Sequence, residues 1–434
     1  MDPLYIGALG FLVLFVLIIL KIPIAIAMML VGVTAFALQT SWTSALTLLV
    51  GDPAASMTSV DMAVVPLFLL MGICATSAGL SRDIYLVAAS FLGHRRGGLA
   101  YATIAGCAAF GAVCGSSTAT TATFTKIALP EMLGRNYSPQ LATGSIAAGG
   151  ALKALIPPSL VMILYSIATN TFILDLFLAA IVPVCLVILL NLGAIWVTTR
   201  RHPEMAPILE PVAWAERKIL LRKAAPALTL IVCVFGGLYS GIFTVNEAAS
   251  VAAVLTVAFA LVRSRFNLKA TFSGMFDATN VAVMVYMVIA GASVFSYFMT
   301  LARVPESLVD AIGLVHAPPI LIVFGLLAAY LVLGAVFDEI SAMIITLPFV
   351  LPVIVELGYD PIWWGIMNVL IVELGLIIPP IGLGVFIIHG LAPQIRLSEI
   401  YRGVVPFIVA DLILLVLLAL FPQIVLAPLT WLRS

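Results

Sequence analysis

Long apolar segments recur along the whole chain and constrain its fold more than any other feature. Charged residues make up only 9% of the 434 residues, so little polar surface remains to solvate an exposed backbone. Lipid offers no hydrogen-bond partners, so the backbone of such segments must pair within helices. The sequence therefore predicts an all-α polytopic membrane protein, with apolar runs at residues 4–20, 22–38, 64–80, 176–198, 226–239, 248–262, 281–301 and 404–426.

A repeated pattern divides the chain into two related halves. Residues 116–159 overlay residues 338–381 without a gap at a shift of 222 residues. The shift matches Ile156-Pro157-Pro158 to Ile378-Pro379-Pro380, and it matches Tyr137 to Tyr359. Prolines that repeat at one fixed offset are hard to obtain by chance in an apolar sequence. We therefore predict an internal duplication.

Basic residues predict the topology of each half. Two apolar runs on either side of a polar tip at 115–118 have basic outer ends, which places both ends in the cytoplasm and predicts a re-entrant hairpin over 96–135. The second copy predicts a hairpin over 319–356 with its tip near 334–338. Five spans plus one hairpin give each half an odd number of crossings, so the second half is inverted. Both termini, and a loop at 40–61, are then predicted to be periplasmic.

Each half also contains a helix that we expect to be broken, over 141–171 and over 362–391. Proline lacks the backbone donor, so carbonyls around 150–156 and 373–378 are expected to lose their partners. Paired broken helices in inverted repeats are typical of secondary transporters, whose binding site lies between the repeats at the membrane midplane. Freed carbonyls beside the hydroxyl-rich tip predict a site for a hard cation such as sodium.

Two ionisable residues stand at membrane depth. Asp338 is the repeat equivalent of Ser116, and a carboxylate there suggests a bound cation or a proton. Lys153 lies near the middle of the first broken helix, where it cannot reach the membrane surface. It could pair with Glu131 or Glu373, or provide a fixed positive charge for an anionic substrate. Both alternatives remain open.

Other classes of function fit the sequence less well. An ion channel needs a continuous polar pore, whereas the polar residues cluster at two tips. An intramembrane hydrolase needs a serine and a lysine within hydrogen-bond reach, and the spacing of Ser116 or Ser159 from Lys126 or Lys153 does not provide this. The four histidines and five cysteines have no metal-ligand or disulfide spacing. We expect no organic cofactor and no nucleic-acid partner. Glu247 is expected to cap a helix.

Several stretches carry a family resemblance. "GHRRGGLA", "GSSTAT", "LPEMLGRNYSPQLATGSIAAGGALKALIPPS", "GLYSGIFTVNEAASVAAV" and "VELGLIIPPIGLGVF" resemble the DctM-type large membrane subunit of tripartite ATP-independent periplasmic (TRAP) transporters. The resemblance implies an elevator-type fold of the ion transporter superfamily and sodium-driven import of a small organic acid in the bacterial inner membrane. It also implies two protein partners, a small four-helix membrane subunit (DctQ type) and a periplasmic substrate-binding protein (DctP type). A sodium-dependent carrier without a binding protein is disfavoured by this resemblance alone.

The resemblance also implies domains and site residues. The domains are scaffold helices and an arm at 1–62, a first transport half at 63–199, a cytoplasmic linker at 200–223, a second set of scaffold helices and arm at 224–274, and a second transport half at 275–434 with a final scaffold helix at 404–427. The implied sodium ligands are Gly115, Ser116, Gly150 and Lys153 (by its backbone) at one tip, and Gly334, Asp338, Glu373 and Ile378 at the other. Substrate is expected near Ser117, Thr118, Lys153, Pro158, Ser159 and Pro380.

This chain departs from many relatives at two of these places. Relatives often have Gly-Ser-Gly at the first tip, where this chain has Cys114-Gly115-Ser116, and they often have glycine at the position of Lys153. The repeat partner of Lys153 within this chain is itself a glycine, Gly375. Lys153 is therefore the place where we expect a property particular to this transporter.

Overall fold

The computed structural model describes residues 3–263, 268–315 and 317–433, and all regular structure in these ranges is helical. The chain ends predicted to be periplasmic, and part of the predicted unit 224–274, fall on residues outside these ranges. Eight helices of the described part are long and apolar enough to cross a membrane. The predicted fold class, an all-α polytopic membrane protein, is confirmed.

The first half runs from α1 to α10. Its elements are α1 (Pro3–Ile19), α2 (Ile24–Gln39), α3 (Trp42–Met57), η1 (Val60–Ala63), α4 (Val64–Ser77), α5 (Leu80–Leu92), α6 (Gly98–Gly111), α7 (Ser117–Gly134), α8 (Pro139–Leu152), η2 (Lys153–Leu155), α9 (Leu160–Thr169) and α10 (Ile173–Arg201).

The second half follows the short turn η3 (Pro203–Met205). Its elements are α11 (Trp214–Tyr239), α12 (Val245–Arg263), α13 (Leu268–Leu301), α14 (Val304–Val315), α15 (Pro319–Val336), α16 (Glu339–Glu356), α17 (Pro361–Gly375), α18 (Leu383–Leu391), α19 (Leu397–Leu420) and α20 (Gln423–Arg433).

The helix boundaries repeat with the sequence. A shift of 222 residues carries α7 onto α16 at both ends, the first residue of α8 onto that of α17, and the last residue of α9 onto that of α18. Matched residues set these boundaries. Ser138 caps α8 and Asp360 caps α17, and each is followed by a proline at the first helical position, where a missing N–H costs nothing. The predicted hairpins and broken helices are present in both halves.

Several segments differ from the sequence-based prediction. The predicted loop at 40–61 contains helix α3, which packs on α2 and α13; the prediction gave weight to its acidic residues and missed its short apolar stretch. The predicted span 64–80 ends at Gly79, whose φ of 73° breaks it, and α4 and α5 meet at an angle of 65°. The predicted linker 200–223 is helical from Trp214, where Arg217 lies 5.2 Å from the ring centroid of Phe91.

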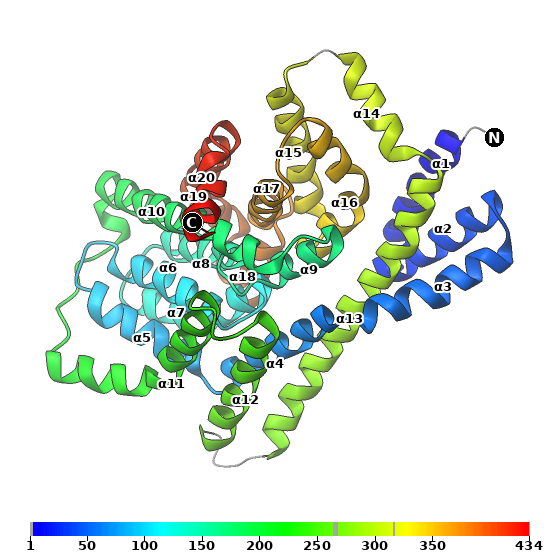
Figure 1. Cartoon of the computed structure of the whole chain (residues 1–434). Helices are drawn as coiled ribbons and strands as arrows, with labels where there is room; N and C mark the ends of the chain where they lie inside the picture. Colours follow the sequence, from blue (N-terminus) through cyan, green and yellow to red (C-terminus); the bar gives the residue numbers. More distant parts are fainter. Residues whose placement is uncertain (1–2, 264–267, 316, 434) are drawn as a thin grey trace.

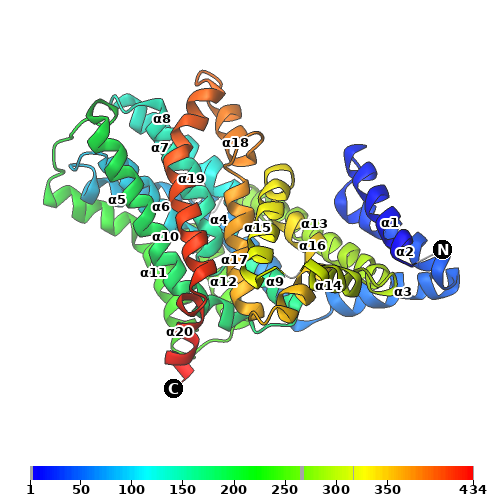
Figure 2. The ribbon, with the colours of Figure 1, turned by 90° about the horizontal axis from the view of Figure 1, so that it is seen from above.

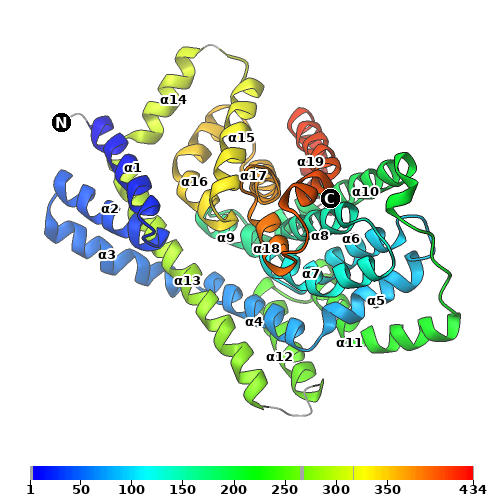
Figure 3. The same cartoon turned by 180° about the vertical axis from the view of Figure 1, so that it is seen from behind.

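The arrangement in space places the broken helices centrally. Helices α1 to α3 form one end of the molecule beside the long helix α13, and α5 and α11 lie towards the opposite end (Figure 1). The view from above and the view from behind show the same order (Figures 2 and 3). Between these ends, α8 packs on α6, α7 and α19, and α17 packs on α15 and α16.

Glycines let several of these helices approach each other at backbone distance. A Cβ atom on Gly144 of α8 would lie 2.1 Å from the carbonyl oxygen of Gly403 on α19, and one on Gly403 would lie 2.0 Å from that of Gln140. Small residues at crossings are the usual means by which membrane helices gain packing contact. α19 is thereby held against the first broken helix.

The expected cap at Glu247 is confirmed. The carboxylate of Glu247 accepts a hydrogen bond from the backbone N–H of Thr244 at 2.8 Å, and the Thr244 hydroxyl accepts one from the N–H of Glu247 at 3.3 Å. This reciprocal pair is a capping box, which satisfies two otherwise free donors at the start of α12.

Candidate functional site

The first hairpin turns between α6 and α7. Ser116 is the N-cap of α7 and accepts a hydrogen bond from the backbone N–H of Ala119 at 3.3 Å. Its hydroxyl also lies 2.9 Å from that of Thr118. On the other side of the turn, Gly72 of α4 packs against backbone atoms of Cys114 and Gly115. The tip is therefore a compact turn held by a hydroxyl pair and a close backbone contact.

The break in the first helix is entirely buried. α8 ends in the 3₁₀ turn η2, Ile156 is extended, and Ser159 caps α9 by accepting from the N–H of Met162 at 3.4 Å. Every residue from 150 to 159 is buried, which includes Pro158. The predicted substrate residues Pro158 and Ser159 thus lie inside the protein, and the Ser159 hydroxyl acts as a helix cap.

Carbonyls that were expected to be free accept hydrogen bonds at both breaks. At the first break, the backbone N–H of Lys153 donates to the carbonyl of Gly150, and the N–H of Ile156 donates to that of Lys153 at 2.9 Å. At the second break, the carbonyls of Glu373, Leu374 and Leu376 accept from backbone N–H groups at 2.9–3.2 Å. The expectation is wrong for these groups because tight turns at the helix ends recover partners for the last carbonyls. Each carbonyl oxygen still has a second lone pair for a cation.

The second break is exposed at the protein surface, whereas the first is buried. Pro379, Pro380 and Ile381 are exposed, and Ile378 is half-buried. The hydroxyl of Tyr401 on α19 donates to the carbonyls of Pro380 and Ile381, at 2.8 and 2.6 Å. This hydroxyl restrains the break from the neighbouring helix α19 of the same half.

The second hairpin matches the first in its cap. Asp338 is the N-cap of α16, and its carboxylate accepts from the N–H of Ser341 at 3.0 Å. Gly334 and Gly375 meet at backbone distance, because a Cβ on Gly375 would lie 2.5 Å from the carbonyl carbon of Gly334. The glycine contact brings the second hairpin against the second broken helix, and the ion site expected there stays a prediction.

A cluster of buried charges joins the two repeats. The hydroxyl of Ser117, the first residue of α7, donates to Oε1 of Glu373 on α17 at 2.8 Å. Glu339, the first residue of α16, lies near Glu373, and the ammonium group of Lys153 interacts with both carboxylates. The exposed fractions are 0% for Lys153, 2% for Glu373 and 8% for Glu339.

The charges in this cluster are incompletely paired. Nζ of Lys153 and the Oε2 atoms of both glutamates have no hydrogen-bond partner among the described residues. The other proposed partner of Lys153, Glu131, forms an ion pair with Arg135 at 2.6 Å on the surface of α7. The Glu131 alternative is therefore wrong, and Glu373 is a neighbour of Lys153 without being hydrogen-bonded to it.

Glu339 was missed by the sequence analysis, although a signal for it exists. The 222-residue shift that pairs Ser116 with Asp338 also pairs Ser117 with Glu339. An acidic residue directly after an N-cap suggests only a favourable charge at a helix start. In the structure Glu339 instead faces the other repeat.

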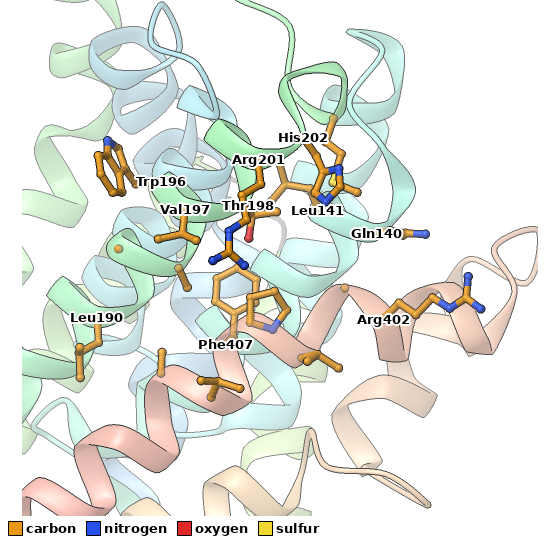
Figure 4. Close-up of a pocket in the computed structure, with 18 of the residues that line it drawn as sticks. Gln140, Leu141, Leu190, Trp196, Val197, Thr198, Arg201, His202, Arg402 and Phe407 are labelled. Carbon is orange, nitrogen blue, oxygen red and sulfur yellow. The ribbon is translucent and has the colours of Figure 1, made fainter.

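A separate groove lies away from these residues. It has a volume of about 750 Å³ and runs between α10 and α19, with Arg201 directed towards Phe407 and Trp196 at the far side (Figure 4). The residues predicted to bind sodium or substrate do not occur among its described lining residues, and its walls are mainly apolar. It is therefore distinct from the candidate site.

Two broken helices, two hairpins and a charged centre shared between repeats are the arrangement typical of a polytopic membrane transporter. A family model for the tripartite ATP-independent periplasmic transporter, DctM component, matches residues 11–424. The chain belongs to this DctM family, and its role is transport rather than catalysis.

Individual comparisons agree with this family. The chain is 33% identical to the C4-dicarboxylate TRAP transporter large permease protein DctM of Pseudomonas aeruginosa, over 85% of this chain and 86% of that protein. It is 30% identical to the 2,3-diketo-L-gulonate TRAP transporter large permease protein YiaN of Escherichia coli, over 86% and 88%. The solved Alcanivorax borkumensis YdaH transporter shares its fold, with a TM-score of 0.61, 16% identity, and coverage of 88% of this chain and 89% of that one.

Proposed function

We propose that this large permease subunit imports a small organic anion, a carboxylate, across a bacterial inner membrane, and that sodium ions drive the import. The hydrogen bond between Ser117 and Glu373 carries the proposal, because it couples the first hairpin tip to the second broken helix. A site shared by both repeats is the arrangement from which secondary transporters alternate access. The names of two relatives, which specify C4-dicarboxylate and 2,3-diketo-L-gulonate, support an organic acid as substrate.

Sodium is supported by the oxygen-rich environment of the second tip. Asp338 brings a carboxylate to the tip, and the break of the second helix brings backbone carbonyls beside Gly382. Carboxylate and carbonyl oxygens are the ligands that helix breaks in transporters offer to sodium. Gly334 and Gly375 hold the hairpin close against the broken helix.

We propose an elevator movement for alternating access. The hairpins and broken helices pack on one another through the pairs α6–α8, α7–α8, α7–α18, α15–α17 and α16–α17. α13 instead packs extensively along α2, and a cavity of about 450 Å³ lies where α13 faces α9 and α16. A compact unit beside a helix pair, with space at their boundary, supports sliding of the first against the second.

The proposed partners are a small four-helix membrane subunit and a periplasmic substrate-binding protein. The test is uptake of radiolabelled organic acid into proteoliposomes that contain this subunit, its small partner and the loaded binding protein. We expect uptake with all components, and none when either partner is omitted. Equal uptake without the binding protein would contradict the tripartite function and favour a carrier that works alone.

A further inference from the structure

The two repeats differ in charge at several matched positions around the shared centre. Lys153 in the first repeat corresponds to Gly375 in the second, and Ser117 in the first corresponds to Glu339 in the second. The first repeat therefore contributes the positive charge of the shared centre. The second contributes a carboxylate at the equivalent hairpin, and Glu373 adds another.

Backbone geometry makes room for the lysine in one repeat only. A Cβ at Gly111, the last residue of α6, would lie 3.0 Å from Cγ of Lys153, so the lysine side chain occupies the space beside this glycine. In the second repeat, Gly375 touches the backbone of Gly334 and leaves no room for any side chain. The side chain of Lys153 thus runs from the first broken helix along the first tip, where it interacts with Cys114, towards the carboxylates of the second repeat.

The charged forms of the two buried carboxyl groups are favoured by a positive charge beside them. A charged group is costly at the middle of a bilayer, and its cost falls only when an opposite charge lies beside it. Glu339 and Glu373 put two carboxyl groups in one buried place. A mobile sodium ion could provide the compensating charge, but the ammonium group of Lys153 already stands among them.

We propose that the ammonium group of Lys153 is a built-in cation that takes the place of a sodium ion at the first hairpin tip. This inference rests on the proposed function and deepens it. The carrier then binds sodium at the second tip, at Asp338, and carries one mobile cation fewer than a carrier with sodium at both tips. Lys153 compensates Glu373 and Glu339 in every step, and its side chain is fully buried.

The test is sodium-specific thermal stabilisation of the purified subunit, measured in sodium chloride against potassium chloride at equal ionic strength. A ligand that binds only the folded state raises the melting temperature according to its concentration and affinity. We compare the wild type with Lys153→Gly, which copies Gly375 and opens the space, and with Lys153→Met, which fills the space without charge. Lys126→Met, on the exposed face of α7, is the matched control.

We expect Lys153→Gly to gain a sodium-specific stabilisation beyond that of the wild type, and Lys153→Met and Lys126→Met to gain none. In the wild type, Asp338→Ala should abolish the sodium shift. In the Lys153→Gly background, Asp338→Ala should leave part of the sodium-specific rise in melting temperature, because sodium then binds at the first tip. No gain in Lys153→Gly would overturn the proposal.

If Lys153→Gly does not fold, the single variant Asp338→Ala, which keeps Lys153, still tests the proposal. A sodium shift that persists in Asp338→Ala with Lys153 intact would show a mobile sodium ion elsewhere and overturn it. These measurements use neither substrate nor partner proteins. If sodium raises the melting temperature as expected but uptake fails, the proposed function is contradicted. If uptake is normal but Lys153→Gly gains no sodium-specific stabilisation, only the built-in cation is contradicted.

Discussion

The hydroxyl of Ser117 lies 2.8 Å from Oε1 of Glu373, and this hydrogen bond links residues 256 positions apart in the chain. Hydrogen bonds to charged groups contribute about 1.5–3 kcal/mol to stability. We expect Ser117→Ala and Glu373→Gln each to slow uptake and lower the melting temperature. In a double-mutant cycle, the second substitution should lower the melting temperature much less in the presence of the first than it does alone. Additive effects would show that the two groups do not act together.

The close contact of Gly334 with Gly375 predicts a steric effect of a single methyl group. Gly375→Ala should destabilise the second tip by about 1–3 kcal/mol, as overpacking does, and should reduce uptake. Gly325→Ala is the matched control, because Gly325 lies in α15 of the same hairpin with open space around it. It should be neutral or slightly stabilising, since alanine favours helix. Equal melting temperatures for the two variants would contradict this packing.

Asn191 and Asp411 form a second buried polar pair, between α10 and α19, with Nδ2 3.4 Å from Oδ1. Asn191→Leu leaves the Asp411 carboxyl without this donor and should lower stability by about 1–3 kcal/mol. The double variant with Asp411→Leu should recover most of the loss, because replacing both partners removes the unsatisfied group. Melting temperatures of the three variants measure this, and a double variant less stable than the single one would refute it.

Tyr401 restrains the second break through the carbonyls of Pro380 and Ile381. Tyr401→Phe keeps the ring and removes the donor, so we expect a folded protein whose half-saturating sodium concentration rises by about fivefold, the equivalent of one hydrogen bond of ~1 kcal/mol. Tyr359→Phe is the control, since the ring of Tyr359 stacks on Trp363 with centroids 4.5 Å apart. An identical sodium dependence in both variants would remove Tyr401 from the site.

Much of the fold could be predicted from proline, glycine and the apolar runs. The two Pro-Pro pairs mark both helix breaks because two adjacent prolines remove successive backbone donors, whereas single prolines such as Pro183 of α10 and Pro226 of α11 lie inside continuous helices. The 222-residue offset then locates the second hairpin from the first. Helix α3 and the twelve-residue helix α14 were not predicted, because short helices depend on the neighbours against which they pack.

The hairpin tips and helix breaks could be located from the sequence, whereas the contacts around them could be predicted only in part. Ser116 and Asp338 are helix caps at the tips, as matched positions suggested. Glu373 was one of the two partners considered for Lys153 from the sequence, and the structure places it beside Lys153. Glu339 was missed, because it reaches Lys153 only when the two repeats pack together.

Sodium dependence of uptake tests the central claim most directly. The initial rate of organic-acid uptake into proteoliposomes with both partner proteins is measured against external sodium, for the wild type and for Asp338→Ala, with Lys126→Met as control. We predict a rate that rises with the inward sodium gradient in the wild type and control, and a weakened dependence in Asp338→Ala. Undiminished wild-type uptake without a sodium gradient, or an unchanged sodium response in Asp338→Ala, would contradict the account.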